Sequence, residues 1–247
     1  MSGWRAGKVI ENRAWTETLF SLRVEAPRLR FEAGQFVRIA LDLDGERVAR
    51  PFSFVNAPAD PVLEFYGVIV PEGPLSPRLA RLAAGETLWI ADNPAGWLIL
   101  SEVPAADELW LVATGTGIAP FLSILRTPAP WQRYRRVILV HGARRAGELV
   151  YAGLIDELGR VQGDRFRSIK FTSREETPGA LNGRIPAAVT DGRLEQAAGA
   201  PIAPERSQFM LCGNPDMLKD MQSALATRGL KKHRRRSPGQ ITVESFW

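Results

Sequence analysis

The segment Leu109–Pro120, Leu-Trp-Leu-Val-Ala-Thr-Gly-Thr-Gly-Ile-Ala-Pro, decides how the C-terminal half of the chain folds. It begins with an apolar run of strand length and ends where a stretch with helical spacing begins. Between them, Gly115 and Gly117 allow the backbone to approach a bound group closely. Such a turn directs helix N–H groups at an anion such as a pyrophosphate. Pro120 stands where a dinucleotide fingerprint has its third glycine, so an ordinary strand-to-helix turn explains the segment equally well.

The same pattern, a short apolar run followed by a helical stretch, recurs further along the chain. Val137–His141 precedes the helical spacing of Leu149–Leu158, and Phe209–Cys212 precedes that of Asp216–Arg228. Strands that alternate with helices form a parallel, doubly wound sheet. We therefore predict an α/β domain of this type over residues 102–247.

The N-terminal half has the pattern of strands and turns. Phe20, Leu22 and Val24 alternate with polar residues, which is the period of a half-buried strand. Asp44-Gly45 is a hairpin signal between two further apolar stretches. Short strands at close spacing predict a small antiparallel β-barrel over residues 1–101.

One helix is expected to interrupt the strands of this barrel. Ser76 can cap its first turn, Pro77 suits its first position, and Gly85 can end it. The boundary between the two predicted domains is expected in Ser101–Asp107, which holds Pro104.

Composition excludes several classes of protein. The 247 residues are 45% hydrophobic and 24% charged, as in folded globular proteins, and no apolar run approaches the roughly 18–20 residues of a membrane span. No apolar signal core follows the first residues, so we expect a cytoplasmic protein. The single cysteine, Cys212, permits neither an intramolecular disulfide nor a cysteine-built metal cluster, and two histidines do not support a zinc site. We predict no metal, so redox chemistry must come from an organic cofactor.

The net charge favours an acidic partner. The formal charge is +5 and the pI is near 9.8, and nucleic acid is one class of partner that this balance suits. The arginines are mostly scattered, however. We interpret the one dense basic run, 231–236, as a solvated surface segment.

Two N-terminal segments hold residues suited to a nucleotide. Arg50-Pro51-Phe52-Ser53 offers a cation, an aromatic face and a hydroxyl at a strand end. Gly73-Pro74-Leu75-Ser76 stands at a helix start, a place where phosphate binds. Taken singly, a solvated strand end and a plain capped turn explain these segments as well.

Taken together, these segments resemble the ferredoxin–NADP reductase family, and its short bacterial members in particular. The resemblance covers nearly the whole chain and rests on five motifs in the family's order. They are Arg50-Pro51-Phe52-Ser53, Gly73-Pro74-Leu75-Ser76, Gly115–Pro120, Cys212-Gly213-Asn214-Pro215 and Val243-Glu244-Ser245-Phe246-Trp247. The resemblance implies that the N-terminal barrel binds FAD and that the C-terminal doubly wound domain binds NADP(H).

The resemblance also implies roles for single residues. Ser53 would hydrogen-bond near flavin N5, Cys212 would lie near the reacting nicotinamide carbon, and Glu244 would stand beside it as a proton or orientation partner. Cys212 could equally be a buried core thiol. The implied FAD-binding residues are Arg50, Pro51, Phe52, Ser53, Pro74, Leu75, Ser76, Thr116, Phe246 and Trp247. The implied NADP-binding residues are Gly115, Thr116, Gly117, Arg144, Arg174, Arg184, Gly213 and Asn214.

Three arginines predict a preference for NADP(H) over NAD(H). Arg144 follows the second strand of the nucleotide domain, where an NAD enzyme tends to place an acid. The resemblance adds Arg174 and Arg184 as further ligands of a 2′-phosphate. Each of them alone could be a surface arginine.

Two aromatic positions depart from the family's pattern, which usually has tyrosine at the position of Phe52 and often at that of Phe246. Stacking survives the loss of a phenol, but a hydrogen bond from its oxygen does not. Trp247 and Phe246 are large side chains for a chain end, so we expect them to be packed. The resemblance implies that Trp247 lies against the adenine of FAD and Phe246 nearer the flavin.

The implied activity is exchange of hydride with NADP(H) and of single electrons with a ferredoxin or flavodoxin. These carriers are acidic, which explains the +5 charge without nucleic acid. The family favours a monomer, and the short apolar runs give no reason to expect a membrane contact. One alternative is the NAD(P)H-dependent reductase component of an oxygenase system, whose cluster would reside on a separate partner. Another is a non-catalytic nucleotide- or nucleic-acid-binding module, which the basic run supports and the five motifs oppose.

Overall fold

A computed structural model describes residues 3–245 of the protein, and they divide into two compact units. Residues up to Ile99 form the N-terminal unit together with Ala119–Thr127. Leu100–Ile118 and the residues from Pro128 onward form the C-terminal unit. One helix from the middle of the chain, α2 (Ala119–Leu125), therefore belongs to the N-terminal unit.

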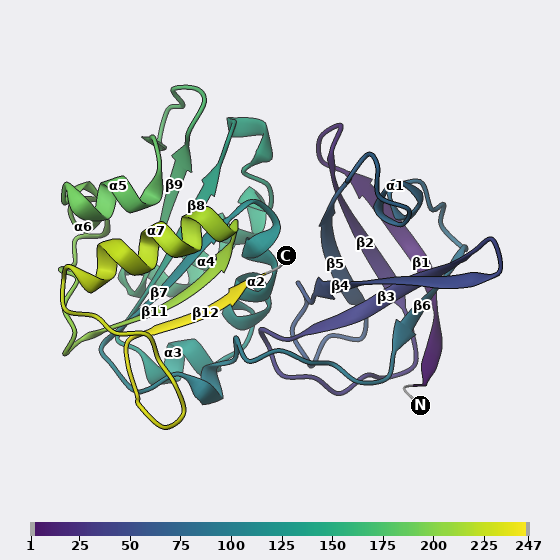
Figure 1. Cartoon of the computed structure of the whole chain (residues 1–247), viewed down its shortest axis with the longest axis horizontal. Coiled ribbons are helices and arrows are strands. Elements are labelled where there is room, and N and C mark those ends of the chain that lie inside the picture. The colour runs from purple at the N-terminus through teal and green to yellow at the C-terminus, as the bar shows by residue number, and fades with distance from the viewer. Residues whose placement is uncertain (1–2, 246–247) are drawn as a thin grey trace. The chain divides into compact units, whose positions relative to one another are not determined.

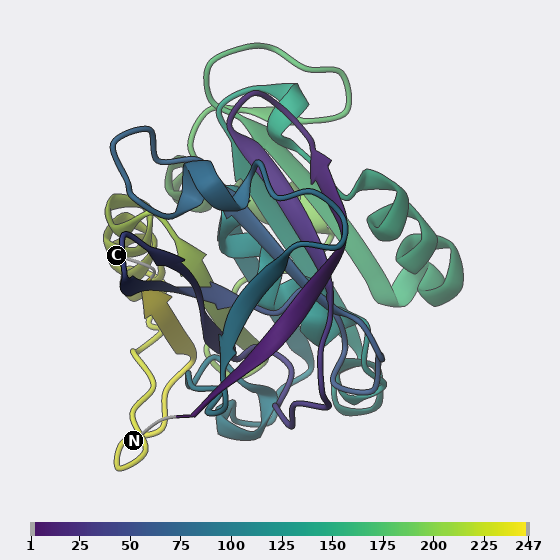
Figure 2. The same cartoon turned by 90° about the vertical axis from the view of Figure 1, so that its right-hand side faces the viewer.

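The N-terminal unit is built on a six-stranded antiparallel sheet. Its strands are β1 (Trp4–Ala14), β2 (Leu19–Glu25), β3 (Phe36–Leu43), β4 (Glu46–Ser53), β5 (Leu63–Val68) and β6 (Thr87–Ala91). They lie in the order β4-β3-β6-β1-β2-β5, and Figure 2 shows β1, in purple, beside β6. An antiparallel bridge between Phe54 and Phe65 joins the continuation of β4 to β5, so the sheet curls into a half-barrel.

The apolar pattern of the sequence produces the core of this unit. In β2, Phe20, Leu22 and Val24 are buried while Arg23 and Glu25 are exposed, as the alternation predicts. Ser21 departs from the alternation, because it is buried and accepts a hydrogen bond from the Trp15 Nε1. The side chains of Phe20, Leu22 and Val24 join a cluster that also holds Phe54, Phe65, Leu75, Leu79, Leu88 and Ile90. Burial of each large apolar side chain contributes about 1.5–3 kcal/mol.

The predicted hairpin is confirmed, whereas the predicted helix is shorter than expected. Asp44 and Gly45 link β3 to β4 with φ of 51° and 85°, as a tight hairpin turn requires. The helix α1 spans only Ser76–Leu79, and the prediction that Ser76 caps it is wrong, because Leu75 occupies the cap position without a side-chain bond. The prediction that Gly85 ends it is also wrong, because the helix ends at Leu79.

The C-terminal unit is built on a six-stranded parallel sheet, as predicted. Its strands are β7 (Glu108–Thr114), β8 (Arg136–Ala143), β9 (Phe166–Thr172), β10 (Leu181–Asn182), β11 (Ser207–Gly213) and β12 (Ile241–Ser245). The strand order is β10-β9-β8-β7-β11-β12. The three apolar runs singled out in the sequence lie within β7, β8 and β11.

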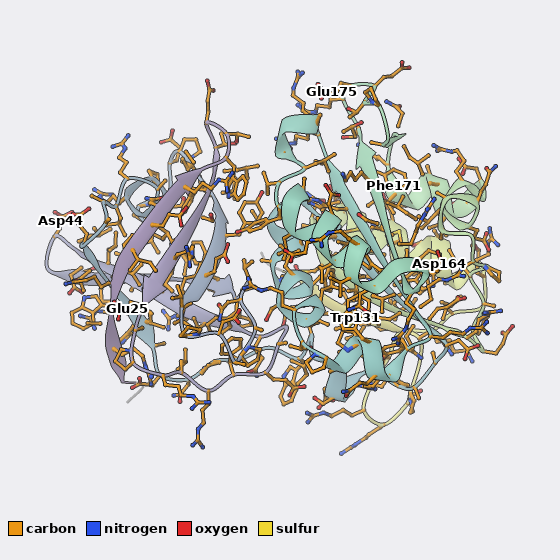
Figure 3. The ribbon with its side chains drawn as sticks, turned by 180° about the vertical axis from the view of Figure 1, so that it is seen from behind. Glu25, Asp44, Trp131, Asp164, Phe171 and Glu175 are labelled. Carbon is orange, nitrogen blue, oxygen red and sulfur yellow. The ribbon has the colours of Figure 1, made fainter. Side chains whose placement is uncertain are left out.

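Helices cover both faces of this sheet (Figure 1). On one face lie α5 (Ile185–Thr190), α6 (Arg193–Ala198) and α7 (Pro215–Ala226), and on the other lie α3 (Ala129–Arg133) and α4 (Ala152–Gln162), with Trp131 of α3 labelled in Figure 3. Short 3-10 turns fall at η1 (Leu100–Glu102), η2 (Gly115–Ile118), η3 (Ala146–Glu148) and η4 (Gly163–Arg165). Trp110 and Phe209 stack at 5.2 Å between ring centroids in the core beneath α5–α7.

The order of the strands places a topological switch point in the middle of the sheet. The chain passes outward from β7 through β8 to β9 and then returns to the other side of β7 as β11. In open α/β sheets, ligands bind outside the carboxyl ends of the strands at such a point. A ligand site is therefore expected at the loops after β7 and β11.

Candidate functional site

At the switch point, the backbone after β7 lies against the end of β11. A Cβ atom on Gly117 would come within 2.5 Å of the Cys212 carbonyl oxygen and 2.9 Å of the Gly213 Cα. Backbone atoms cannot rotate away, so this approach requires glycine. The Thr114 Oγ accepts a hydrogen bond of 3.0 Å from the Asn214 N–H, which joins the same two loops a second time. The predicted residues 115–117 and 212–214 therefore form one continuous surface of backbone.

A buried histidine holds the glycine-rich turn from below. His141 of β8 is 2% exposed, and its Nε2 lies 3.1 Å from the Gly115 carbonyl oxygen. Burial lowers the pKa of the imidazole from 6.5 to about 4, with Lys170 adding to the shift and the Gly115 hydrogen bond opposing it. The ring is thus neutral at neutral pH. Because a carbonyl oxygen only accepts, we assign the proton to Nε2.

Cys212 and Glu244 lie side by side on one face of the sheet. They are paired residues in the register of β11 and β12, and their neighbours Leu211 and Val243 belong to the opposite face, beneath α5–α7. Cys212 is fully buried, and burial, followed by the field of Glu244, raises the pKa of its thiol. A thiol is therefore present in place of the thiolate that a covalent nucleophile requires.

Asn214 has a structural task at this edge. Its Oδ1 accepts hydrogen bonds from Asp216 N–H at 2.9 Å and Met217 N–H at 3.3 Å, which caps α7. The side chain is exposed, and its NH₂ group remains able to donate to a ligand. The sequence identified this residue for cofactor binding but not for capping.

The three arginines expected at a 2′-phosphate lie on neighbouring segments. The Arg174 N–H donates to the Arg144 carbonyl at 2.9 Å, so the loops after β8 and β9 meet. Arg184 precedes α5 and follows β10, which pairs with β9. All three side chains are exposed, and within residues 3–245 no carboxylate pairs with their guanidinium groups. They can therefore all bind an anion.

In the N-terminal unit, Ser53 has an unused hydroxyl. It is 3% exposed, and its Oγ has no hydrogen-bond partner among the residues that the structure describes. Phe52 is half-buried beside Gly67, where a Cβ would come within 2.7 Å of its ring. A buried hydroxyl without a partner costs free energy unless a ligand supplies one. Ser53 thus fits a bound polar group.

Arg50 and the loop after β5 supply donors for an anion. Arg50 is exposed, and its one hydrogen bond among the described residues goes to the Ala49 carbonyl at 2.8 Å. The Ser76 Oγ accepts the Val70 N–H at 2.8 Å, which leaves the hydroxyl proton to donate. The N–H of Leu75, just before α1, lacks an intrahelical acceptor, as at every helix start. Pro74 is exposed, and its carbonyl accepts a hydrogen bond from Arg78. This donor set and the Ser53 hydroxyl fit a dinucleotide such as FAD.

The basic run at 231–236 forms a closed loop. The Gln240 N–H donates to the Lys231 carbonyl and the His233 N–H donates to the Ile241 carbonyl, which fixes the base of the loop. Arg235 pairs with Glu102 at 2.7 Å. The other cations of the run are exposed, as the interpretation of a solvated segment predicts.

Several sequence predictions concern features outside this arrangement. Phe246 and Trp247 lie outside the described residues, which end after β12. Among residues 3–245 no group of His, Cys, Asp and Glu side chains is arranged to hold a metal ion. No helix in this range is long and apolar enough to span a membrane.

Sequence reasoning missed two residues of the site, Thr114 and His141. The signal for His141 was present, because this polar residue directly follows the apolar strand core Val137–Val140. Thr114 offered none, since its role depends on the position of Asn214, a hundred residues away.

Comparison with known proteins identifies the family. The model of the oxidoreductase NAD-binding domain matches residues 111–223. Flavodoxin/ferredoxin–NADP reductases of Shigella flexneri and Escherichia coli (strain K12) are 48% and 47% identical to this chain over 100% of each chain. The chain belongs to the flavodoxin/ferredoxin–NADP reductase family. A ferredoxin NADP+ reductase of Neisseria gonorrhoeae with bound FAD and NADP has a TM-score of 0.94 at 34% identity, over 99% of each chain. The resemblance drawn from the five motifs is confirmed.

Because His141 is buried and neutral, the free energy of unfolding should fall in acid, and substitution of His141 should remove this part of the pH dependence. The folded-state pKa of about 4 lies below the unfolded value of 6.5, so the unfolded chain takes up this proton first. The contribution is complete above pH 6.5 and is lost as the pH falls toward 4, by up to about 3 kcal/mol. Urea unfolding of wild type and His141→Gln between pH 7.5 and 4.5 measures it. The free energy of unfolding of the variant should depend less steeply on pH, by the equivalent of about one bound proton. Identical slopes for the variant and the wild type would contradict the assignment.

Proposed function

We propose that this protein is an FAD-dependent flavodoxin/ferredoxin–NADP(+) reductase. The observation that carries the proposal is its full-length identity of 47–48% to two reductases of this name. A relative at 34% identity holds FAD and NADP, and we extend both cofactors to this chain. Two observations on the described residues support that extension: the Ser53 hydroxyl has no partner, and Arg144, Arg174 and Arg184 make no ion pair.

We propose that residues 1–101 hold FAD and that residues 102–247 hold NADP(H). A nicotinamide transfers two electrons at once as hydride, whereas the carrier accepts or gives one electron at a time. Bound FAD would supply the chemistry that links the two kinds of transfer. Arg50 and Ser76 would bind the diphosphate, and Leu75 would donate its N–H to the same group. Pro51 and Pro74 would shape these turns, because proline fixes φ. Thr116 would complete the flavin surface from the glycine-rich turn.

At the flavin, Phe52 and Ser53 would orient the isoalloxazine ring and form a hydrogen bond to it. Ser53 would donate or accept a hydrogen bond near flavin N5, with the Phe52 ring packed beside the isoalloxazine. A phenylalanine in place of tyrosine keeps this packing but forms no hydrogen bond. Phe246 and Trp247 would stack on FAD, with Trp247 on the adenine.

At the nicotinamide, the protein would position the nicotinamide ring and exclude water from it. Gly115, Gly117 and Gly213 give the ring access to the backbone at the switch point. The Cys212 thiol, neutral because it is buried, would pack against the reacting carbon, and Glu244 would orient the ring or hold a proton. Asn214 would donate from its NH₂ group.

We propose a ferredoxin or flavodoxin as the electron carrier and a cytoplasmic monomer as the state of the enzyme. The carrier is part of the names of the relatives, and the resemblance to the family implies that carriers of this kind are acidic. The net charge of +5 and the exposed cations of the 231–236 loop provide a complementary field.

Reduction of the bound flavin by the two coenzymes tests the proposed function. The purified protein should take up FAD, and NADPH should bleach its visible bands at far lower concentrations than NADH. Arg174→Ala should raise the NADPH concentration required by roughly ten- to a hundredfold, because a charge-assisted hydrogen bond is worth about 1.5–3 kcal/mol. Arg167→Ala, an exposed arginine of β9, serves as the control. A colourless protein that binds no FAD would contradict the flavoenzyme, and equal response to both coenzymes would contradict NADP specificity.

The carrier reaction should depend on ionic strength. Reduction of added ferredoxin by NADPH is expected to slow as salt rises from about 10 to 150 mM, since screening shortens the reach of the basic field. Reduction of a neutral quinone under the same conditions should change little. A carrier rate indifferent to salt would count against electrostatic steering.

A further inference from the structure

Glu175 lies at the carboxyl end of the parallel sheet, where the loops after β8 and β9 meet (Figure 3). Its Oε1 accepts a hydrogen bond of 2.6 Å from the Ala146 N–H. Its Oε2 accepts one of 3.3 Å from the Arg145 guanidinium. The carboxylate therefore ties the segment after Arg144 to the segment after Arg174.

The main-chain carbonyl of Glu175 ties in a third segment. It accepts hydrogen bonds from the Thr172 Oγ1 at 2.9 Å and from the Asn182 Nδ2 at 3.1 Å. Asn182 ends β10 and is followed by Gly183, whose φ of 102° turns the chain toward Arg184. One residue thus connects all three segments that carry the candidate 2′-phosphate arginines.

We propose that Glu175 is a positioning residue that sets the preference for a 2′-phosphorylated coenzyme. Glu175 acts through the hydrogen bond that its carboxylate accepts from the Ala146 N–H. This bond holds the loop after β8, which carries Arg144, against the loop after β9, which carries Arg174. This inference rests on the proposed function, since it concerns how the three arginines are arranged. The three guanidinium groups make no ion pairs within the described residues, so the backbone beneath them determines where they point.

Electrostatics alone gives the opposite expectation. A carboxylate next to a phosphate site repels the ligand, so removing it would strengthen binding. Arg145 offsets the charge of Glu175 locally, whereas the adjacent Glu176 is exposed and makes no ion pair in the described chain. For Glu175→Ala, loss of positioning therefore predicts weaker binding of the 2′-phosphate, whereas loss of the charge alone predicts tighter binding. Glu176→Ala removes a nearby charge without removing the hydrogen bond to Ala146, so it measures the effect of charge alone.

The test compares 2′,5′-ADP with 5′-AMP, two probes that differ by the 2′-phosphate. Their dissociation constants are measured by calorimetry on the FAD-loaded wild type and on Glu175→Ala, Glu175→Gln and Glu176→Ala. Glu175→Ala should weaken binding of 2′,5′-ADP by roughly tenfold, the effect of one misplaced charge-assisted hydrogen bond, and leave 5′-AMP unchanged. Glu175→Gln keeps an oxygen that can accept the Ala146 N–H, so it should bind nearly as the wild type does. Steady-state kinetics should show the same pattern as a raised KM for NADPH with kcat unchanged.

Three results would overturn the proposal. They are equal or tighter binding of 2′,5′-ADP by Glu175→Ala, equal losses in Glu175→Gln and Glu175→Ala, and a loss shared with 5′-AMP, which would indicate a general structural defect. Failure of the proposed NADP specificity looks different, because the wild type itself would then bind both probes equally.

Discussion

The contact between Gly117 and the backbone of Cys212 and Gly213 is the constraint on which the rest of the site depends. It permits the turn after β7 to lie directly on the end of β11. The Thr114 hydroxyl, by accepting the Asn214 N–H, and the His141 imidazole, by contacting the Gly115 carbonyl, fix the turn from two further directions. The edge of the sheet is consequently a rigid surface of backbone, which suits a ligand that must be held in one orientation.

Buried neutral groups and exposed cations lie at different places around this surface. His141 and Cys212 are buried, and burial keeps both neutral at neutral pH, so neither perturbs the field at the switch point. Arg144, Arg174 and Arg184, which we propose as ligands of the 2′-phosphate, are exposed. Positive charge therefore lies where we propose that the 2′-phosphate binds, and Glu244, beside the Cys212 thiol, brings a carboxylate to the place where we propose that hydride transfer occurs.

Much of this architecture could be predicted from the sequence, because its signals are local. The apolar run and glycines of Leu109–Pro120 fix a strand, a turn and a helix within twelve residues, and the Asp44-Gly45 turn fixes a hairpin in the same way. The cap at Ser76 was predicted wrongly because its hydroxyl has an alternative donor in the Val70 N–H, which pattern alone does not show. Thr114 and Glu175 were missed for a related reason, because each acts through a partner that the fold brings close, 100 and 29 residues away. His141 had a local signal as a polar residue at the end of an apolar run, but its partner Gly115, 26 residues away, could not be predicted from it.

The most direct test of this account is the rate at which NADPH reduces the flavin in a Gly117→Ala variant. The added Cβ would lie 2.5 Å from the Cys212 carbonyl oxygen, so the two loops must separate. Anaerobic rapid mixing, with rates normalised to bound FAD, should show a loss on the order of a hundredfold, as expected for a displacement of about 1 Å at a reacting centre. Gly153→Ala, where a Cβ meets nothing within 4 Å, should react as the wild type does. A Gly117→Ala enzyme that is reduced at the wild-type rate would contradict the account.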